Sequence, residues 1–276
     1  MEVFELSKVD AISLDVLTKS QFVINIHSFC GSSSIQEFAG GDLKGLLPKL
    51  DQLDKLRYAT YMAEGLADIH SVASVDDDNS MASLIHNDIN MDNVLLGYRN
   101  GKTMPIFNDF NIAIFPKKNA QTGQPCTFKG RFANPQWMSP EQLSVSDENH
   151  LTIGSLNEKI DVYALGNILF KVVCGNSPWK YDYQKDPKVL PKITEELKEK
   201  IVRAKLRGAK PKVPPDIRNT TDLSIKSVLN AMNRCYRNDP VLRPSARDTY
   251  NYLKTELDAI ERSVRRSGGG KSQPIV

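Results

Sequence analysis

A short polar segment in the first half of the chain carries residue types that suit phosphoryl transfer. It reads HNDINMDN over residues 86–93 and matches the pattern H-x-D-[LI]-x-x-x-N. Such a reaction needs a carboxylate that accepts the proton of the attacking hydroxyl and an amide oxygen that holds a metal ion nearby. Asp88 and Asn93 could supply these two groups from one loop. Taken alone, the segment is explained equally well as a polar loop with Asx turns.

A second acidic position follows a short apolar run. Asp109 and Phe110 come directly after Pro-Ile-Phe at residues 105–107. An aspartate at the end of a strand suits a magnesium ligand, because Mg²⁺ prefers oxygen ligands, and the following phenylalanine can pack into a core. Turns are rich in Asp and Asn, so this pattern is weak without its neighbours.

Three later segments extend the series. Residues 134–141 (NPQWMSPE) read like a variant of an A-P-E segment. Residues 161–166 (DVYALG) open an apolar stretch that predicts a buried helix. Arg243 lies in DPVLRP, and if it is buried it needs a carboxylate partner, because a lone buried charge is costly. Glu141 is the natural partner.

The elements that must position these segments are mainly helical. Apolar residues that repeat at three and four predict helices over residues 10–19, 56–69, 160–174, 197–206, 225–235 and 246–262. Alternation of apolar and polar residues predicts a strand over residues 22–29, with a short partner strand over residues 34–39. Short apolar runs follow at residues 94–96 and 105–107. The acidic run in residues 72–83 predicts a solvated insertion loop.

Composition excludes several classes of protein. Hydrophobic residues make up 40% and charged residues 25% of 276 positions, as in ordinary globular proteins. The net charge of +3 is too small to predict a nucleic-acid partner. The longest apolar stretch, residues 162–174, is shorter than a membrane span, and the first ten residues lack a signal sequence. From the short apolar stretch we expect no membrane segment in this chain. From the four widely spaced cysteines we expect reduced thiols and a cytoplasmic location.

Taken in order, these segments resemble the catalytic domain of eukaryotic protein kinases of the serine/threonine type, over about residues 9–257. The resemblance implies an α+β, protein kinase-like fold with a mainly α-helical large lobe and a truncated small lobe. We expect a small-lobe remnant over residues 1–39, a large lobe over residues 40–262 and a disordered tail over residues 263–276. ATP and Mg²⁺ are the implied cofactors, and a protein substrate or binding partner is the implied partner.

The resemblance also assigns roles to single residues of the large lobe. Asp88 takes the place of the catalytic base, and Asn93 and Asp109 take the places of the magnesium ligands. Phe110 takes a position in the regulatory spine, and Asp161 anchors the catalytic loop. Glu141 and Arg243 match the buried ion pair of the large lobe.

The same resemblance places the nucleotide at the junction of the two lobes. Residues 36–39 (QEFA) resemble the end of the strand that leads to the hinge and the hinge itself. Adenine would bond to backbone groups around Glu37 and Ala39. Asp42 falls where an acidic residue often meets the ribose.

Several family features are absent from the sequence. No G-x-G-x-x-G and no V-A-I-K precede Glu37, and Asp10 stands nearest to the place of the small-lobe glutamate. A truncated gene model is the favoured explanation, and a partner that completes the lobe or a true pseudokinase are the alternatives. Asn87 replaces the arginine of H-R-D, and Asn90 replaces the lysine two residues after the base. The loss of that positive charge lowers the expected turnover, because electrostatic stabilisation dominates phosphoryl transfer.

Three functions therefore stay open at this stage. The favoured one is a protein kinase that phosphorylates Ser or Thr. The second is a pseudokinase that binds a partner without catalysis. The third, a small-molecule phosphotransferase of the kinase-like superfamily, is disfavoured by Glu141, Asp161 and Arg243, which fit the protein-kinase large lobe.

Overall fold

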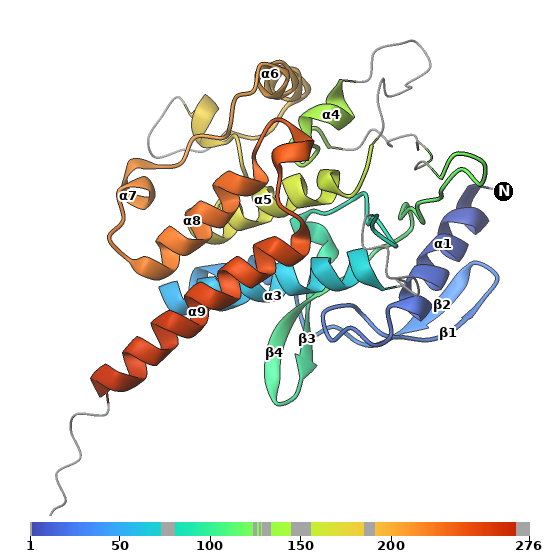
Figure 1. Cartoon of the computed structure of the whole chain (residues 1–276), viewed down its shortest axis with the longest axis horizontal. Helices are drawn as coiled ribbons and strands as arrows, with labels where there is room; N and C mark the ends of the chain where they lie inside the picture. The colour runs from blue at the N-terminus through green and yellow to red at the C-terminus, as the bar shows by residue number, and fades with distance from the viewer. Residues whose placement is uncertain are drawn as a thin grey trace, which may run out of the picture.

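The computed structural model describes residues 2–72, 81–123, 126, 128, 134–144, 156–184 and 191–268. Two long helices, α3 (Gln52–Ser71) and α5 (Lys159–Cys174), lie at the centre, and α8 (Leu223–Cys235) and α9 (Ala246–Gly268) pack beside them (Figure 1). Helix α3 begins at Asp51, whose side chain accepts a hydrogen bond of 2.7 Å from the Asp54 N–H. This cap satisfies one of the free amides of the first turn.

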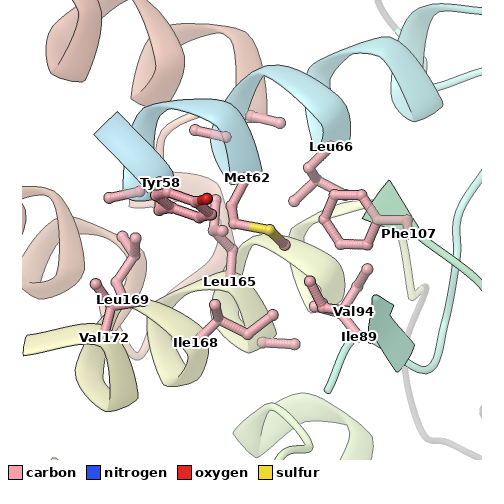
Figure 2. Close-up of a cluster of buried hydrophobic side chains, with 14 of the residues drawn as sticks. Tyr58, Met62, Leu66, Ile89, Val94, Phe107, Leu165, Ile168, Leu169 and Val172 are labelled. Atoms are coloured by element: carbon pink, nitrogen blue, oxygen red, sulfur yellow. The ribbon is translucent and has the colours of Figure 1, made fainter. Parts of the chain in front are cut away.

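The main core lies between α3, α5 and a β-hairpin. Met62 and Leu66 of α3 face Leu165 of α5, and Val94 and Phe107 close one side (Figure 2). Helix α5 is buried along nearly its whole length, as predicted from the apolar stretch over residues 162–174, which Gly166, Asn167 and Lys171 interrupt. A helix that is apolar on all sides belongs inside a protein, so α5 is the axis around which the large lobe packs.

The hairpin of β3 (Val94–Arg99) and β4 (Lys102–Phe107) is antiparallel, with Val94 opposite Phe107. Its turn residues Asn100 and Gly101 both have positive φ, as a two-residue turn that matches strand twist requires. Because the pairing ends at Val94 and Phe107, the preceding Asn93 and the following Asn108 come together. The Asn108 N–H donates a 3.0 Å hydrogen bond to the Asn93 carbonyl.

The first part of the chain forms α1 (Glu2–Val16) and a hairpin of β1 (Ile26–Cys30) and β2 (Ser33–Gln36) (Figure 1). Helix α1 begins eight residues before the predicted start, because the count of apolar repeats registered only its buried part. The predicted strand over residues 22–29 is divided. Its first residues pair with β4 instead, where the Phe107 N–H donates to the Phe22 carbonyl (2.7 Å) and the Ile24 N–H donates to the Phe107 carbonyl (3.0 Å).

The remaining helices are shorter: α2 (Leu43–Leu46), α4 (Pro140–Leu143), α6 (Glu195–Leu206) and α7 (Pro215–Arg218). Helix α9 runs to Gly268, so residues 263–268 of the predicted disordered tail are helical. The rest of that predicted tail, and most of the predicted loop over residues 72–83, lie outside the described residues. None of the described helices is long and apolar enough to cross a membrane.

Candidate functional site

The loop of residues 86–93 is anchored by Asp161, in the first turn of α5. The Asp161 carboxylate accepts hydrogen bonds from the backbone N–H groups of His86 (2.7 Å) and Asn87 (2.9 Å). The His70 ring lies 3.1 Å from the same carboxylate, and Asp161 is almost fully buried. The predicted anchoring role of Asp161 is therefore confirmed.

Asn87 sits at a sharp bend of this loop, with φ of 66°. Asparagine tolerates this left-handed conformation better than most residues. Its side-chain Nδ2 donates to the Ile112 carbonyl (3.1 Å) and so joins the loop to the chain that follows Asp109. The Asn87 side chain thus makes a structural hydrogen bond at the position where the H-R-D pattern has an arginine.

Asp88 is held by two amide side chains. Asn90 donates to its Oδ1 (3.0 Å), and Asn93 donates to its Oδ2 (3.1 Å). Each oxygen of the carboxylate thus has one donor and keeps acceptor capacity for a further proton-bearing group. The loop delivers an oriented carboxylate, which is the requirement for a base that receives a hydroxyl proton.

Asn93 and Asp109 lie on the two chains that leave the β3–β4 hairpin. Asn93 uses its Nδ2 on Asp88, and among the described residues its Oδ1 has no hydrogen-bond partner and could accept a metal ion. The Asp109 carboxylate has no hydrogen-bond or ion-pair partner among the described residues. Mg²⁺ is commonly held by one or two protein oxygens, with water and substrate phosphates filling its other positions. These two side chains fit that requirement, and the described residues contain no cluster of three His, Cys, Asp or Glu side chains that could hold a metal.

Phe110 is fully buried and packs against His86, with ring centroids 4.4 Å apart. Its backbone N–H donates to Asp10 Oδ1 (2.7 Å), while Gln36 donates to Asp10 Oδ2 (3.2 Å). Burial, reinforced by the nearby Asp109 charge, raises the pKa of the Asp10 carboxyl above its ordinary value. Asp10 therefore connects α1 to the segment that carries Asp109. Among the described residues, the Asp10 carboxylate has no Lys or Arg partner.

The expected nucleotide segment lies between β2 and α2. Glu37 binds Arg99 through its carboxylate (2.5 and 2.7 Å), and its N–H donates to the Asn25 carbonyl (3.0 Å). Within the described part of the chain, the Glu37 carbonyl and the Ala39 N–H have no hydrogen-bond partner. Asp42 caps α2 by accepting from the Gly45 N–H (2.7 Å).

The structure brings the predicted residues together in two groups. Asp88, Asn90 and Asn93 contact one another, and Asp109 follows Asn108, which is bonded to Asn93. The second group runs from Glu37 to Asp42 and is attached to β3. An ion pair between Lys44 of α2 and Asp92 of the 86–93 loop links the two groups.

A small hollow opens beside Asp88. Its walls come from the catalytic loop, from α5 and from the segment of residues 134–138, and include Asn87, Asp88, Asn134, Trp137, Met138 and Ala164. Asp88 therefore shares one hollow with Asn134, Trp137 and Met138.

Comparison with known proteins gives the family. A model of the protein kinase domain matches residues 15–253. The chain belongs to the protein kinase family. The match covers both hairpins, the catalytic loop and the helices from α2 to α8.

Several curated kinases resemble this kinase domain at low identity. It is 23% identical over 252 residues to the receptor protein-tyrosine kinase CEPR2 of Arabidopsis thaliana, covering 88% of this chain and 22% of that protein. It is 23% identical over 266 residues to the serine/threonine-protein kinase BCK1/SLK1/SSP31 of Saccharomyces cerevisiae, covering 92% and 15%. It is 25% identical over 239 residues to the serine/threonine-protein kinase pkn3 of Myxococcus xanthus, covering 84% and 37%. The chain thus spans well under half the length of these relatives.

The predicted ion pair of the kinase large lobe is confirmed. Arg243 binds Glu141 in a bidentate pair, with N–O distances of 2.6 and 2.9 Å. The guanidinium side chain is fully buried and also donates to the carbonyls of Lys159 (2.7 Å), Arg237 (2.8 Å) and Asn238 (3.2 Å). These bonds satisfy the donors of a buried charge, as its burial requires.

One polar residue of this kinase domain, Lys205 in α6, was missed by the sequence analysis. It is fully buried and lies against residues 135–138. A signal was available, because Lys205 follows Ile201 by four residues and so shares the buried face of α6. A lysine on the apolar face of a predicted helix is the pattern to look for.

Proposed function

We propose that the chain is the catalytic domain of a kinase that transfers the terminal phosphoryl group of Mg·ATP to a Ser or Thr hydroxyl of a protein. The observation that carries this proposal is the Asp88 carboxylate, which Asn90 and Asn93 orient. It lies beside a hollow whose lining includes Asn134, Trp137 and Met138. Two of the three relatives reported above are named serine/threonine-protein kinases, which supports hydroxyl groups of Ser or Thr as acceptors.

Each predicted site residue has a place in this proposal. Asp88 accepts the proton of the attacking hydroxyl. Asn93 Oδ1 and the Asp109 carboxylate hold Mg²⁺, which neutralises charge on the phosphates. The free Glu37 carbonyl and Ala39 N–H match the donor and acceptor of an adenine edge, and the remaining carboxylate oxygen of Asp42 is left for a ribose hydroxyl.

Turnover by this chain is expected to be low. Asn90 donates to Asp88 as a lysine would, but it brings no positive charge to the transferred phosphoryl group. Asp10 has a backbone amide and Gln36 as partners, so no phosphate-binding lysine is held in its usual place among the described residues. Electrostatic stabilisation usually contributes the largest share of catalysis.

The same observations favour a second candidate, a pseudokinase that binds a protein partner. In that case the loop around Asp88 keeps its geometry without catalysing a reaction, and Asn87 and Asn90 only stabilise the loop through their hydrogen bonds. A partner complex should then survive simultaneous loss of the Asp88 and Asp109 carboxylates. Both candidates fit a reducing compartment such as the cytoplasm, since all four cysteines are unpaired.

The test is phosphate transfer from labelled ATP with Mg²⁺ to Ser, Thr and Tyr peptide libraries. Asp88→Asn should abolish transfer while leaving the melting temperature nearly unchanged. Asp258→Asn is the charge-matched control, because Asp258 lies on α9, outside this loop, and pairs with Lys254. Transfer that persists in the Asp88 variant refutes the assignment of the base.

Binding of ATP is measured separately, so that an inactive chain is still informative. Thermal stabilisation by Mg·ATP should be lost in Asp109→Asn, because a ligand raises stability only through the state that binds it. A chain that gains no stability from Mg·ATP and transfers no phosphate, but retains a partner after loss of both carboxylates, is the pseudokinase.

A further inference from the structure

Lys205 of α6 makes an unusual set of contacts for a lysine. Its side chain is fully buried, and its Nζ donates to the carbonyls of Pro135 (2.8 Å), Gln136 (3.1 Å) and Met138 (2.6 Å). Three carbonyls from one short segment therefore converge on one ammonium group. The contact joins positions about 70 residues apart in the sequence.

Three carbonyl acceptors favour the charged form of the Lys205 side chain. An ammonium group has exactly the three N–H donors that three carbonyl oxygens accept, whereas a neutral amine has two and a lone pair. Tyr163 and Trp179 add their ring faces, at 5.0 and 5.8 Å from Nζ, and aromatic faces attract cations. Burial lowers the pKa of Lys205 well below its ordinary value, and the Glu141 charge opposes that effect. Residues 135–138 are thus held in place by hydrogen bonds to a buried ammonium group, whose burial is itself unfavourable.

The segment that Lys205 holds is the wall of the hollow beside Asp88. Asn134, Trp137 and Met138 line that hollow. Two further bonds fix the same segment: Gln136 donates to the Pro178 carbonyl (2.6 Å), and Asn167 donates to the Trp137 carbonyl (2.8 Å). Of these supports only Lys205 binds three residues of the segment at once.

We propose that Lys205 is a positioning residue for the protein substrate, acting by holding the carbonyls of residues 135–138 so that the segment presents a fixed wall next to Asp88. The substrate class rests on the proposed function. Lys205 touches neither nucleotide nor reacting atoms, and its effect reaches the substrate through the segment alone. Helix α6 thereby becomes part of the acceptor side of the site.

The test compares two variants of the same helix. Lys205→Met removes the ammonium group and keeps most of the side-chain volume. Ile201→Ala is the matched control, because Ile201 is also fully buried in α6 but donates no hydrogen bond to the segment. Both variants are expected to lower the melting temperature.

Hydrogen exchange gives a readout that does not need activity. In Lys205→Met, the amides of residues 134–144 should exchange about tenfold faster or more, since each lost bond involved a charged donor. In Ile201→Ala the same amides should keep their protection, even at equal loss of melting temperature. Equal exchange in both variants, or unchanged exchange in Lys205→Met, overturns the proposal.

Kinetics supply the second readout. If the native chain transfers phosphate, Lys205→Met should raise KM for the protein or peptide acceptor about tenfold while KM for ATP stays within about twofold. An equal rise of both constants contradicts a role on the acceptor side. A chain without transfer refutes the proposed function only, because the exchange experiment still decides whether Lys205 holds the segment.

Loss of folding is also decisive. If Lys205→Met does not fold, Lys205→Gln replaces it, because an amide keeps two donors for the three carbonyls. This variant should show a smaller rise in exchange over residues 134–144. If neither variant folds, Lys205 supports the whole domain and the specific role is refuted.

Discussion

The carboxylate of Asp10 accepts a 2.7 Å hydrogen bond from the backbone N–H of Phe110, 100 residues later in the chain. The bond reaches from α1 to the residue that follows the candidate metal ligand Asp109. In the sequence, Asp10 stands nearest to the place where family kinases have a small-lobe glutamate that pairs with a lysine. Here the acid binds a neutral amide, so its charge is poorly compensated and its pKa is raised by burial.

Asp10→Asn should therefore raise the melting temperature at pH 7. A raised pKa means that the ionised carboxylate is less favourable in the folded than in the unfolded chain, so the wild type carries this cost at neutral pH. The cost is relieved as the pH falls through the folded pKa and is absent below the unfolded pKa near 4. The gain of the variant should thus vanish in a melting series taken down to about pH 3.

The matched variant is Asp10→Ala, which removes the acceptor of the Phe110 N–H as well as the charge. It should melt below Asp10→Asn at every pH, because a buried amide loses its partner. A lower melting temperature for Asp10→Asn than for the wild type at pH 7 contradicts the argument.

Glu141→Gln should destabilise the domain by about 3–5 kcal/mol, because it leaves the buried Arg243 without its counter-charge. Urea unfolding at constant m-value measures the loss. Arg203→Gln serves as the comparison, since its pair with Glu199 is exposed on both sides and should contribute less than about 1 kcal/mol. Similar losses in the free energy of unfolding for the two variants would contradict the claim that burial makes the Arg243 pair more important for stability.

Asn90→Lys should raise the rate of phosphate transfer by about tenfold or more, because it places a positive charge beside Asp88. It should also cost about 1 kcal/mol of stability, since Asn90 Oδ1 accepts from the N–H groups of Asp92 (2.8 Å) and Asn93 (3.2 Å) as an N-cap. Asn90→Ala loses the same cap without adding charge. The ratio of kcat values for these two variants measures the combined effect of the charge and of the hydrogen bond to Asp88, and a ratio near one argues against both.

Gly65→Ala should destabilise the packing of Phe22 and Phe107 against α3. An added Cβ would lie 2.6 Å from the Phe22 Cβ and 3.0 Å from the Phe107 ring, so side chains or backbone must shift. Overpacking of this kind costs about 1–3 kcal/mol. Gly45→Ala, whose Cβ would meet only Asp42 Oδ1 at 3.5 Å, is the control. Unfolding in urea that shows no difference between them would contradict the packing argument.

Two of the four cysteines should react with a thiol reagent in the native protein. Cys30 and Cys126 are exposed, whereas Cys174 and Cys235 are buried. Burial raises the pKa of both buried thiols to about 12, which keeps them protonated and inert at neutral pH. All four should react after denaturation, and modification of Cys174 at the native rate of Cys30 would be inconsistent with this fold.

The sequence predicted what local spacing can encode. Five positions separate Asp88 from Asn93, so one loop had to bring them together. The apolar runs over residues 94–96 and 105–107 were recognised, but their pairing into the hairpin that joins Asn93 to Asn108 was not predicted. The Glu141–Arg243 pair followed from the need to compensate a buried charge. Contacts such as Asp10 with Phe110 depend on the tertiary placement of α1, and no spacing rule reports that.

Lys205 shows the same limit in another form. Its helix and its buried face were within reach of pattern analysis, but the three carbonyls that justify a lysine there come from a distant segment. The early start of α1 was missed for a related reason, because exposed helical residues such as Val3 and Phe4 add nothing to a count of buried repeats.

The attachment of Glu37 to Arg99 changes where the molecule can bend. The segment after β2 is bonded to β3 through this pair and through Gly40 and Leu96, while Phe22 and Ile24 are bonded to Phe107 at the end of β4. The β3–β4 hairpin is therefore hydrogen-bonded to the chain before residue 42, while its residues Val94 and Phe107 lie in one core with α3 and α5. A bend at the link near residue 40 would have to break these bonds, so we expect the strands before residue 40 and the helical core to unfold together.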